Sequence, residues 1–176
     1  MYEESHFVNN DVGVVLLQYF SPNASNFYGH SYYRYKKSYG DKAKGFTEKI
    51  QENDVGVELK GKYLGKDVRL CVYNSNITKT VYLIDIFFKK GYFMDLYEQY
   101  LDFREKFNGI YGKPTEILDE SFEETLEFGK LPMCATYYES SKGLISLEIS
   151  EDKHCVEISF QDKRNAEIMR KEKPQK

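Results

Sequence analysis

Residues 56–112 constrain the fold more than any other part of the sequence, because two different periodicities follow one another there. Residues 56–63 and 68–74 alternate in the manner of strands, and residues 80–88 are apolar on both faces, which is typical of a central strand. Residues 91–111 then repeat apolar side chains every three or four positions: Phe93, Leu96, Tyr97, Tyr100, Phe103, Phe107 and Ile110. We therefore predict three strands and one long amphipathic helix, which ends before Pro114.

The chain after this helix is expected to repeat the strand pattern. Residues 133–139, 144–150 and 154–161 read as three strands separated by short polar turns, and the charged residues 162–173 read as a helix. Residues 115–130 carry many carboxylates but lack the spacing and the turn glycine of a calcium loop. We interpret them as a solvated loop, and we predict no metal site.

The first 55 residues are less regular. Residues 12–20 form an apolar run of strand length, and residues 41–52 are predicted to form a short helix capped by Asp41. Between them lies a tyrosine-rich stretch, whose candidate binding residues are Tyr28, Tyr32, Tyr33 and Tyr35. Tyrosine offers contact area at low entropic cost, so the stretch suits a contact surface, although rings that lie across a sheet and fill its gaps give the same pattern.

The order helix, strand, strand, strand occurs twice in this interpretation, over residues 41–88 and 91–161. It predicts one α+β domain over residues 1–176 (divisible into 11–55, 56–114 and 115–176). Two α-β-β-β units would share an antiparallel sheet of about six to seven strands. Both helices would then pack on one face, and the other face would be partly wet.

Composition excludes several classes of function. The formal net charge is -3, which does not supply the basic field that nucleic-acid binding requires. The sequence has no apolar run long enough to cross a membrane, and residues 1–10 do not resemble a signal peptide. As given, the chain is expected to be cytoplasmic, or exported if a native leader precedes it; its oligomeric state is left open.

The residues that commonly carry chemistry do not form a recognisable motif. Cys71, Cys134 and Cys155 fall in strand patterns without metal-ligand spacing, so buried reduced thiols are expected. The sequence has no nucleophile elbow, no H-E-x-x-H motif and no phosphate-binding loop before a helix. We therefore predict no catalytic residue and no cofactor.

Three short elements resemble a known group of sequences. They are Gly61-Lys62-Tyr63-Leu64-Gly65, Tyr111-Gly112-Lys113-Pro114, and the segment from Ile158 to Asn165, which reads I-S-F-Q-D-K-R-N. Together they resemble a group of uncharacterised small α+β proteins common in gut bacteria, over about residues 56–171. Members of that group often begin with a secretion signal, which these first residues do not match, and no activity is implied. The tandem α-β-β-β order also resembles the arrangement of small periplasmic inhibitor proteins.

Two functions from different classes remain open. The first is a non-catalytic binding or inhibitor protein with a protein partner, of which an immunity-like role against a basic toxin is one form. The second is a small-molecule binder or an unrecognised hydrolase with a pocket between helix and sheet. A pocket lined by inward polar groups, such as Asp85 near Arg69, would favour the second function.

Overall fold

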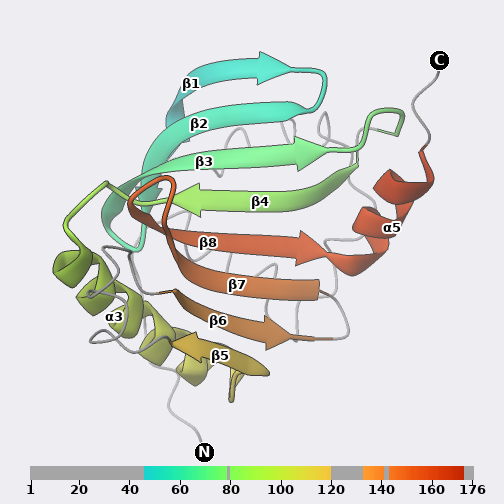
Figure 1. The fold of residues 1–176 in the computed structure, drawn as a ribbon. Coiled ribbons are helices and arrows are strands. Elements are labelled where there is room, and N and C mark those ends of the chain that lie inside the picture. Colours follow the sequence, from blue (N-terminus) through green and yellow to red (C-terminus); the bar gives the residue numbers. More distant parts are fainter. Residues whose placement is uncertain (1–45, 79, 120–132, 141–142, 173–176) are drawn as a thin grey trace, which may run out of the picture.

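A computed structural model describes residues 46–78, 80–119, 133–140 and 143–172 of the chain. Within these ranges the fold is α+β: eight strands form one antiparallel sheet, accompanied by two helices (Figure 1). The fold class predicted from the sequence is therefore confirmed, with eight strands where six to seven were expected. The predicted strand at residues 12–20 lies outside the described ranges.

The strands follow the chain in two groups. The first group contains β1 (Phe46–Asn53), β2 (Gly56–Tyr63), β3 (Lys66–Asn74) and β4 (Val81–Phe87). The second group contains β5 (Glu116–Asp119), β6 (Cys134–Glu139), β7 (Gly143–Ser150) and β8 (Cys155–Asp162). Helix α3 (Phe93–Tyr111) follows the first group and helix α5 (Lys163–Lys171) follows the second.

Each group is an antiparallel meander, and the two meanders meet through their last strands. The strand order is β1-β2-β3-β4-β8-β7-β6-β5, so β4 and β8 are neighbours at the centre of the sheet. The expected helix-strand-strand-strand order was wrong, because each unit consists of four strands followed by one helix. The doubling of the architecture was anticipated, but the first unit begins with strand β1 in place of the predicted helix, and the second begins with β5 rather than with α3.

Strand β1 is the first difference between the predicted and the observed elements. Residues 41–52 were expected to form a helix, but β1 pairs antiparallel with β2 from Phe46↔Gly61 to Asn53↔Gly56. The Asn53 side chain closes this hairpin by accepting hydrogen bonds from the backbone N–H groups of Val55 and Gly56, at 3.0 and 3.1 Å. Cross-strand hydrogen bonds with β2 therefore override a weak local helical pattern.

Strand β5 is the second difference. The solvated loop expected over residues 115–130 begins as a four-residue strand that pairs with β6, from Glu116↔Tyr137 to Asp119↔Cys134. All four of its residues are exposed, so burial leaves no alternating pattern in this segment. The pairing depends on the neighbouring strand rather than on local sequence. Residues 120–130 of the expected loop lie outside the described ranges.

The turn between β2 and β3 shows why this hairpin is tight. Leu64 and Gly65 both have positive φ, 49° and 75°, and they are the two residues between the strands. Two residues with positive φ are typical of the turns that match the right-handed twist of paired strands. Gly65 adopts this conformation without steric cost, whereas Leu64 retains it while packing against the hydrophobic core.

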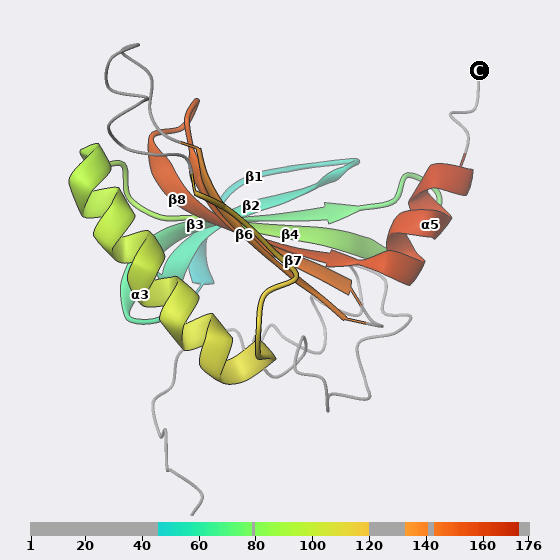
Figure 2. The same ribbon diagram turned by 60° about the horizontal axis from the view of Figure 1, so that its bottom comes forward.

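Helix α3 covers one face of the sheet (Figure 2). Four residues of the predicted stripe are buried against it: Leu96, Tyr100, Phe103 and Phe107. Ile110 lies at the margin and is 41% exposed. The opposing sheet residues come from alternate positions of the strands, such as Leu70, Ile84, Leu147 and Ile158. We call this the core face, and the opposite side of the sheet the distal face.

Helix α3 ends at Tyr111, as its sequence predicts. Gly112 follows with a φ of 81°, and its N–H donates to the carbonyl of Asn108. Neither described helix contains an apolar stretch of the length needed to cross a bilayer.

Candidate functional site

The tyrosines that the sequence singled out, Tyr28, Tyr32, Tyr33 and Tyr35, lie outside the described residues. The structure therefore neither places them nor tests them. A candidate site within the described part of the chain has to be sought on the sheet itself, where side chains that do not join the core gather on the distal face.

The alternation of the strands decides which side chains reach the distal face. On β2, β3 and β4 the core positions include Val57, Leu70 and Ile84, so their neighbours in sequence point the other way. The register then aligns distal residues across the sheet: Glu58↔Cys71, Cys71↔Asp85 and Asp85↔Ser159 form one row. Arg69↔Phe87 and Phe87↔Glu157 form the next row.

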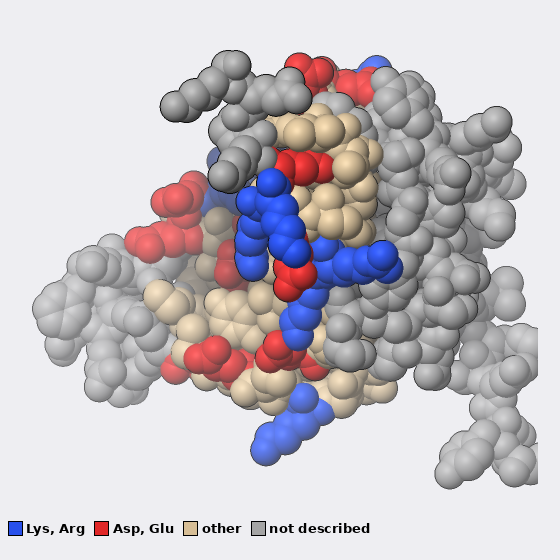
Figure 3. Space-filling view, turned by 90° about the vertical axis from the view of Figure 1, so that its right-hand side faces the viewer, with Lys and Arg blue, Asp and Glu red and all other residues tan. Residues whose placement is uncertain are grey.

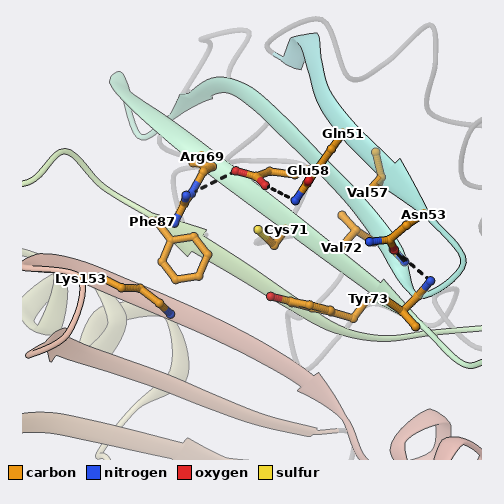
Figure 4. Close-up of a pocket in the computed structure, with 12 residues that line it drawn as sticks. Gln51, Asn53, Val57, Glu58, Arg69, Cys71, Val72, Tyr73, Phe87 and Lys153 are labelled. Atoms are coloured by element: carbon orange, nitrogen blue, oxygen red, sulfur yellow. Dashed lines mark hydrogen bonds and ion pairs between the residues drawn. The ribbon is translucent and has the colours of Figure 1, made fainter.

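A cleft of about 210 Å³ lies on this face (Figure 4). One wall is the β1–β2 hairpin, from Gln51 to Glu58. The floor and the opposite wall come from β3, β4 and the β7–β8 turn, through Arg69, Cys71, Tyr73, Phe87 and Lys153. Polar and aromatic side chains from four strands and the β7–β8 turn thus converge on one small space.

Glu58 is held in place at the edge of this cleft. Gln51 Nε2 donates to Glu58 Oε2 at 2.8 Å, and Arg69 Nε lies 3.3 Å from Glu58 Oε1 (Figure 4). Its side chain is only 14% exposed, whereas that of Arg69 is 47% exposed. The carboxylate is thus fixed by two neighbouring strands, and the terminal nitrogens of Arg69 are not used by this pair.

Phe87 lies between two cations. The Arg69 guanidinium carbon is 4.8 Å from the centre of the ring, and Lys153 Nζ is 4.0 Å from it. Each contact is within the range of a cation–π interaction, worth about 0.5–1 kcal/mol at a partly exposed position. The ring is 4% exposed, so both cations lie against a nearly buried aromatic side chain.

Three carboxylates adjoin Lys153 on the distal face; we call Asp85, Glu148 and Glu157 the acidic cluster. Glu148 and Glu157 are direct cross-strand neighbours on β7 and β8. Lys153 Nζ lies 2.8 Å from Glu157 Oε2, and Ser159 Oγ donates to Asp85 Oδ1 at 2.7 Å. Like charges directly opposite one another destabilise a sheet, so this arrangement costs free energy.

The pKa values of the cluster reflect that cost. Burial raises the pKa of Asp85, and the Glu157 charge adds to the increase, while the Ser159 hydrogen bond and Lys153 oppose it. Burial likewise raises the pKa of Glu148, together with the charges of Glu157 and Asp85. The positive charge of Lys153 lowers both of these pKa values, and the same ammonium group pairs with Glu157.

The thiol and the phenol in the cleft are poor nucleophiles. Burial, together with the Glu58 carboxylate, raises the pKa of Cys71, against smaller opposing effects of Arg69 and Tyr73. Burial also raises the pKa of Tyr73. Both groups therefore remain protonated near neutral pH and act as hydrogen-bonding groups. None of the three cysteines is in a disulfide; Cys134 and Cys155 are buried as the sequence predicts, whereas Cys71 is only half-buried.

The sequence suggested a pocket between helix and sheet, with Asp85 near Arg69. The cleft instead lies on the distal face, and Arg69 lines it whereas Asp85 does not. Arg69 pairs with Glu58, and Asp85 accepts a hydrogen bond from Ser159. The importance of Phe87 and Lys153 was missed, because their contacts cross between elements distant in sequence. In the described ranges, no group of three or more His, Cys, Asp or Glu residues is arranged to hold a metal ion.

Because comparison with known proteins finds no match, a function has to be inferred from the residues of this site. No protein-family model matches the chain, and neither a curated protein nor a solved structure matches it.

Proposed function

We propose that this chain is a binding protein of the inhibitor or immunity type, which takes a basic protein partner on the distal face of its sheet. The observation that supports this proposal is the charge imbalance beside the cleft: among the described residues, Lys153 is the cation that pairs with Glu157 and lowers the pKa of both Asp85 and Glu148, one ammonium group against three carboxylates. A partner's lysine or arginine would supply the missing positive charge. Groups held in an electrostatically unfavourable state are enriched at functional sites.

The size of the cleft favours a protein partner over a drug-sized ligand. Its volume of about 210 Å³ is below the roughly 300–1,000 Å³ typical of small-molecule pockets. A cleft of this size suits one inserted side chain, surrounded by flatter contact over the rest of the sheet. Glu148 is half-buried and Glu116 is exposed, so part of the acidic surface is accessible to such a partner.

Two peptides of equal length, one rich in lysine and one rich in glutamate, test this charge preference. In an NMR titration of the full chain, we expect the lysine-rich peptide to shift the amide signals of Asp85, Glu148 and Glu157. The glutamate-rich peptide should leave them unchanged. Raising the salt from about 50 mM to about 300 mM should weaken the response, because it shortens the screening length.

A matched pair of variants separates a local effect from a change in net charge. Glu148→Gln removes one carboxylate from the cluster, and Glu105→Gln removes one from the exposed surface of α3. We expect only Glu148→Gln to weaken binding of the lysine-rich peptide. Equal weakening by both variants, or equal binding of the two peptides, would contradict a basic partner on the distal face.

The tyrosine-rich stretch is proposed as a second part of the same contact surface. If Tyr28, Tyr32, Tyr33 and Tyr35 contact the partner, then replacing Tyr32 and Tyr35 by alanine should reduce binding while leaving the melting temperature nearly unchanged. A fall of many degrees in melting temperature would instead place these rings in the core.

The cleft also favours a second candidate function, binding of a small ligand, since Arg69, Tyr73 and Lys153 supply hydrogen-bond donors around one space. A thermal-shift screen with small molecules distinguishes the two functions. A compound that raises the melting temperature of the wild-type chain but not of Arg69→Ala would favour this second candidate.

A further inference from the structure

The turn between β3 and β4 binds the Glu172 carboxylate through three hydrogen-bond donors. The backbone N–H of Ile77 donates to Glu172 Oε2 at 2.7 Å, and the backbone N–H of Thr78 donates to Oε1 at 3.0 Å. The Thr78 hydroxyl donates to the same Oε1 at 2.7 Å. Both oxygens of one carboxylate are thus bound by residues 94 and 95 positions away in the chain.

The hydroxyl groups of Ser75, Thr78 and Thr80 are hydrogen-bonded to one another and orient these donors. Thr78 Oγ1 lies 2.8 Å from Ser75 Oγ and 3.0 Å from Thr80 Oγ1. A hydroxyl has one proton, and Thr78 gives its proton to Glu172, so Ser75 and Thr80 are the donors in these two contacts. Ser75 is fully buried, and its Oγ also accepts from the Thr80 N–H at 3.2 Å. The turn is therefore oriented by groups that solvent does not reach.

The electrostatics of Glu172 agree with a site built for an anion. Partial burial opposes ionisation, but hydrogen bonds, chiefly from the Ile77 N–H and from the hydroxyl and N–H of Thr78, lower its pKa to about 2. Lysine and arginine side chains gather in the middle of this end of the molecule (Figure 3). The sequence of helix α5 contains four such residues: Lys163, Arg164, Arg170 and Lys171.

Helix α5 is attached at two points of very different character. Near its first turn, Asn165 is buried, and its side-chain amide donates to the Val81 carbonyl at 2.8 Å. The Asp162 side chain also caps this end by accepting from the Asn165 N–H. At the other end the attachment is the exposed Glu172 carboxylate. The last turn can therefore lift from the sheet while the first turn stays in place.

We propose that residues Ser75–Thr78 form a carboxylate-binding site, that Glu172 is its internal ligand, and that an external carboxylate takes its place when the end of α5 lifts. The ligand class is a carboxylate, free or on an acidic peptide, because the donors match the two oxygens of the group now bound. This inference is independent of the distal face and of the partner proposed for it.

The test removes the Glu172 side chain and adds an external carboxylate. In the full-length Glu172→Ala variant, we expect acetate to shift the amide signals of Ile77 and Thr78 saturably in an NMR titration. In the wild-type chain the same shift should need a roughly tenfold or higher acetate concentration, since an intramolecular ligand competes at high effective concentration. The peptide acetyl-Gly-Glu-Gly-amide serves as the second probe, because its only carboxylate is on a side chain.

The two probes distinguish the source of the ligand. An equal response to both means that a free carboxylate is sufficient, and a stronger response to the peptide points to an acidic peptide ligand. Glu167→Ala is the matched control, since Glu167 is exposed on the same helix and is not among the hydrogen-bond partners described for Ile77 and Thr78. The proposal is overturned if neither probe shifts Ile77 and Thr78 in Glu172→Ala, or if Glu167→Ala responds equally.

Glu172→Gln covers the case in which the alanine variant does not fold. Its neutral amide keeps the size of the side chain, so faster amide hydrogen exchange in the last turn of α5, without loss of protection at Asn165, is the expected result. Unchanged exchange in that turn would also overturn the proposal.

Discussion

The hydroxyl group of Tyr100 allows a quantitative test of how α3 is held against the sheet. Tyr100 is fully buried, and its hydroxyl donates to Asp119 Oδ1 at 2.9 Å. It also lies 2.6 Å from Thr136 Oγ1, and because Tyr100 has given its proton to Asp119, Thr136 is the donor in that contact. Replacing Tyr100 by phenylalanine removes one oxygen and both hydrogen bonds without changing the ring.

The two lost hydrogen bonds do not cost the same. Asp119 keeps a strong partner, because Arg104 lies 2.6 Å from its other oxygen. Thr136 is fully buried, and the contact with Tyr100 is its one described side-chain hydrogen bond, so its hydroxyl is left unsatisfied. A buried unsatisfied polar group costs about 1–3 kcal/mol. We therefore expect Tyr100→Phe to destabilise the chain by about 2 kcal/mol, or roughly 4–8 °C in melting temperature.

Chemical and thermal unfolding, followed by circular dichroism, measure this change. Tyr63→Phe is the matched control, because Tyr63 is also fully buried but its hydroxyl has no hydrogen-bond partner among the described residues. Since no such bond is lost, we expect Tyr63→Phe to change the stability by less than about 0.5 kcal/mol or to increase it. Equal changes in the two variants would refute the role assigned to the Tyr100 hydroxyl.

Four further predictions concern backbone contacts and pH. Gly143→Ala should destabilise by about 1–3 kcal/mol, because its added Cβ would lie 2.2 Å from the carbonyl oxygen of Gln161. Gly109→Ala, which meets nothing within 4 Å inside α3, should stabilise by about 1 kcal/mol; urea unfolding tests both signs. The raised pKa of Asp85 means that the wild type loses stability as pH rises from 3.8 through that pKa. Asp85→Asn keeps an acceptor oxygen for Ser159, so it should be more stable than wild type at pH 7 and lose this advantage below the ordinary pKa. The pKa of Glu172, lowered from 4.5 to about 2, means that its contribution is present above pH 4.5 and is lost as pH falls towards 2. Unfolding of Glu172→Gln and wild type should then converge at the acid end, and a constant difference between them would contradict this account.

The strands that alternate strongly were predictable because burial imposes a pattern on their sequences. The predicted strand at residues 56–63 has the bounds of β2, and β3, β4, β6, β7 and β8 begin and end within two residues of their predicted bounds. The predicted helix at residues 91–111 ends at the same residue as α3. The edge strands β1 and β5 were missed for the complementary reason: residues 49–53 of β1 and all four residues of β5 are exposed, so pairing leaves little trace in the sequence there.

The candidate site was less predictable than the fold. That Arg69, Asp85 and Glu157 avoid the core follows from alternation, and Asp85 was singled out as a polar residue in an apolar strand. The residues that contact them could not be predicted from the sequence. Glu58 reaches Arg69 because β2 pairs with β3, and Lys153 reaches Phe87 only because β4 lies beside β8.

The sequence alone determined which side of each strand and of α3 is apolar, because the periods of the backbone repeat locally and burial selects side chains at that period. Only the tertiary structure decided that the two meanders meet at β4 and β8, which brings Lys153 to Phe87 and the acidic cluster. It also decided that Glu172 fills the turn at Ile77 and Thr78. Contacts of this kind join residues far apart along the chain, and no local pattern of side chains encodes them.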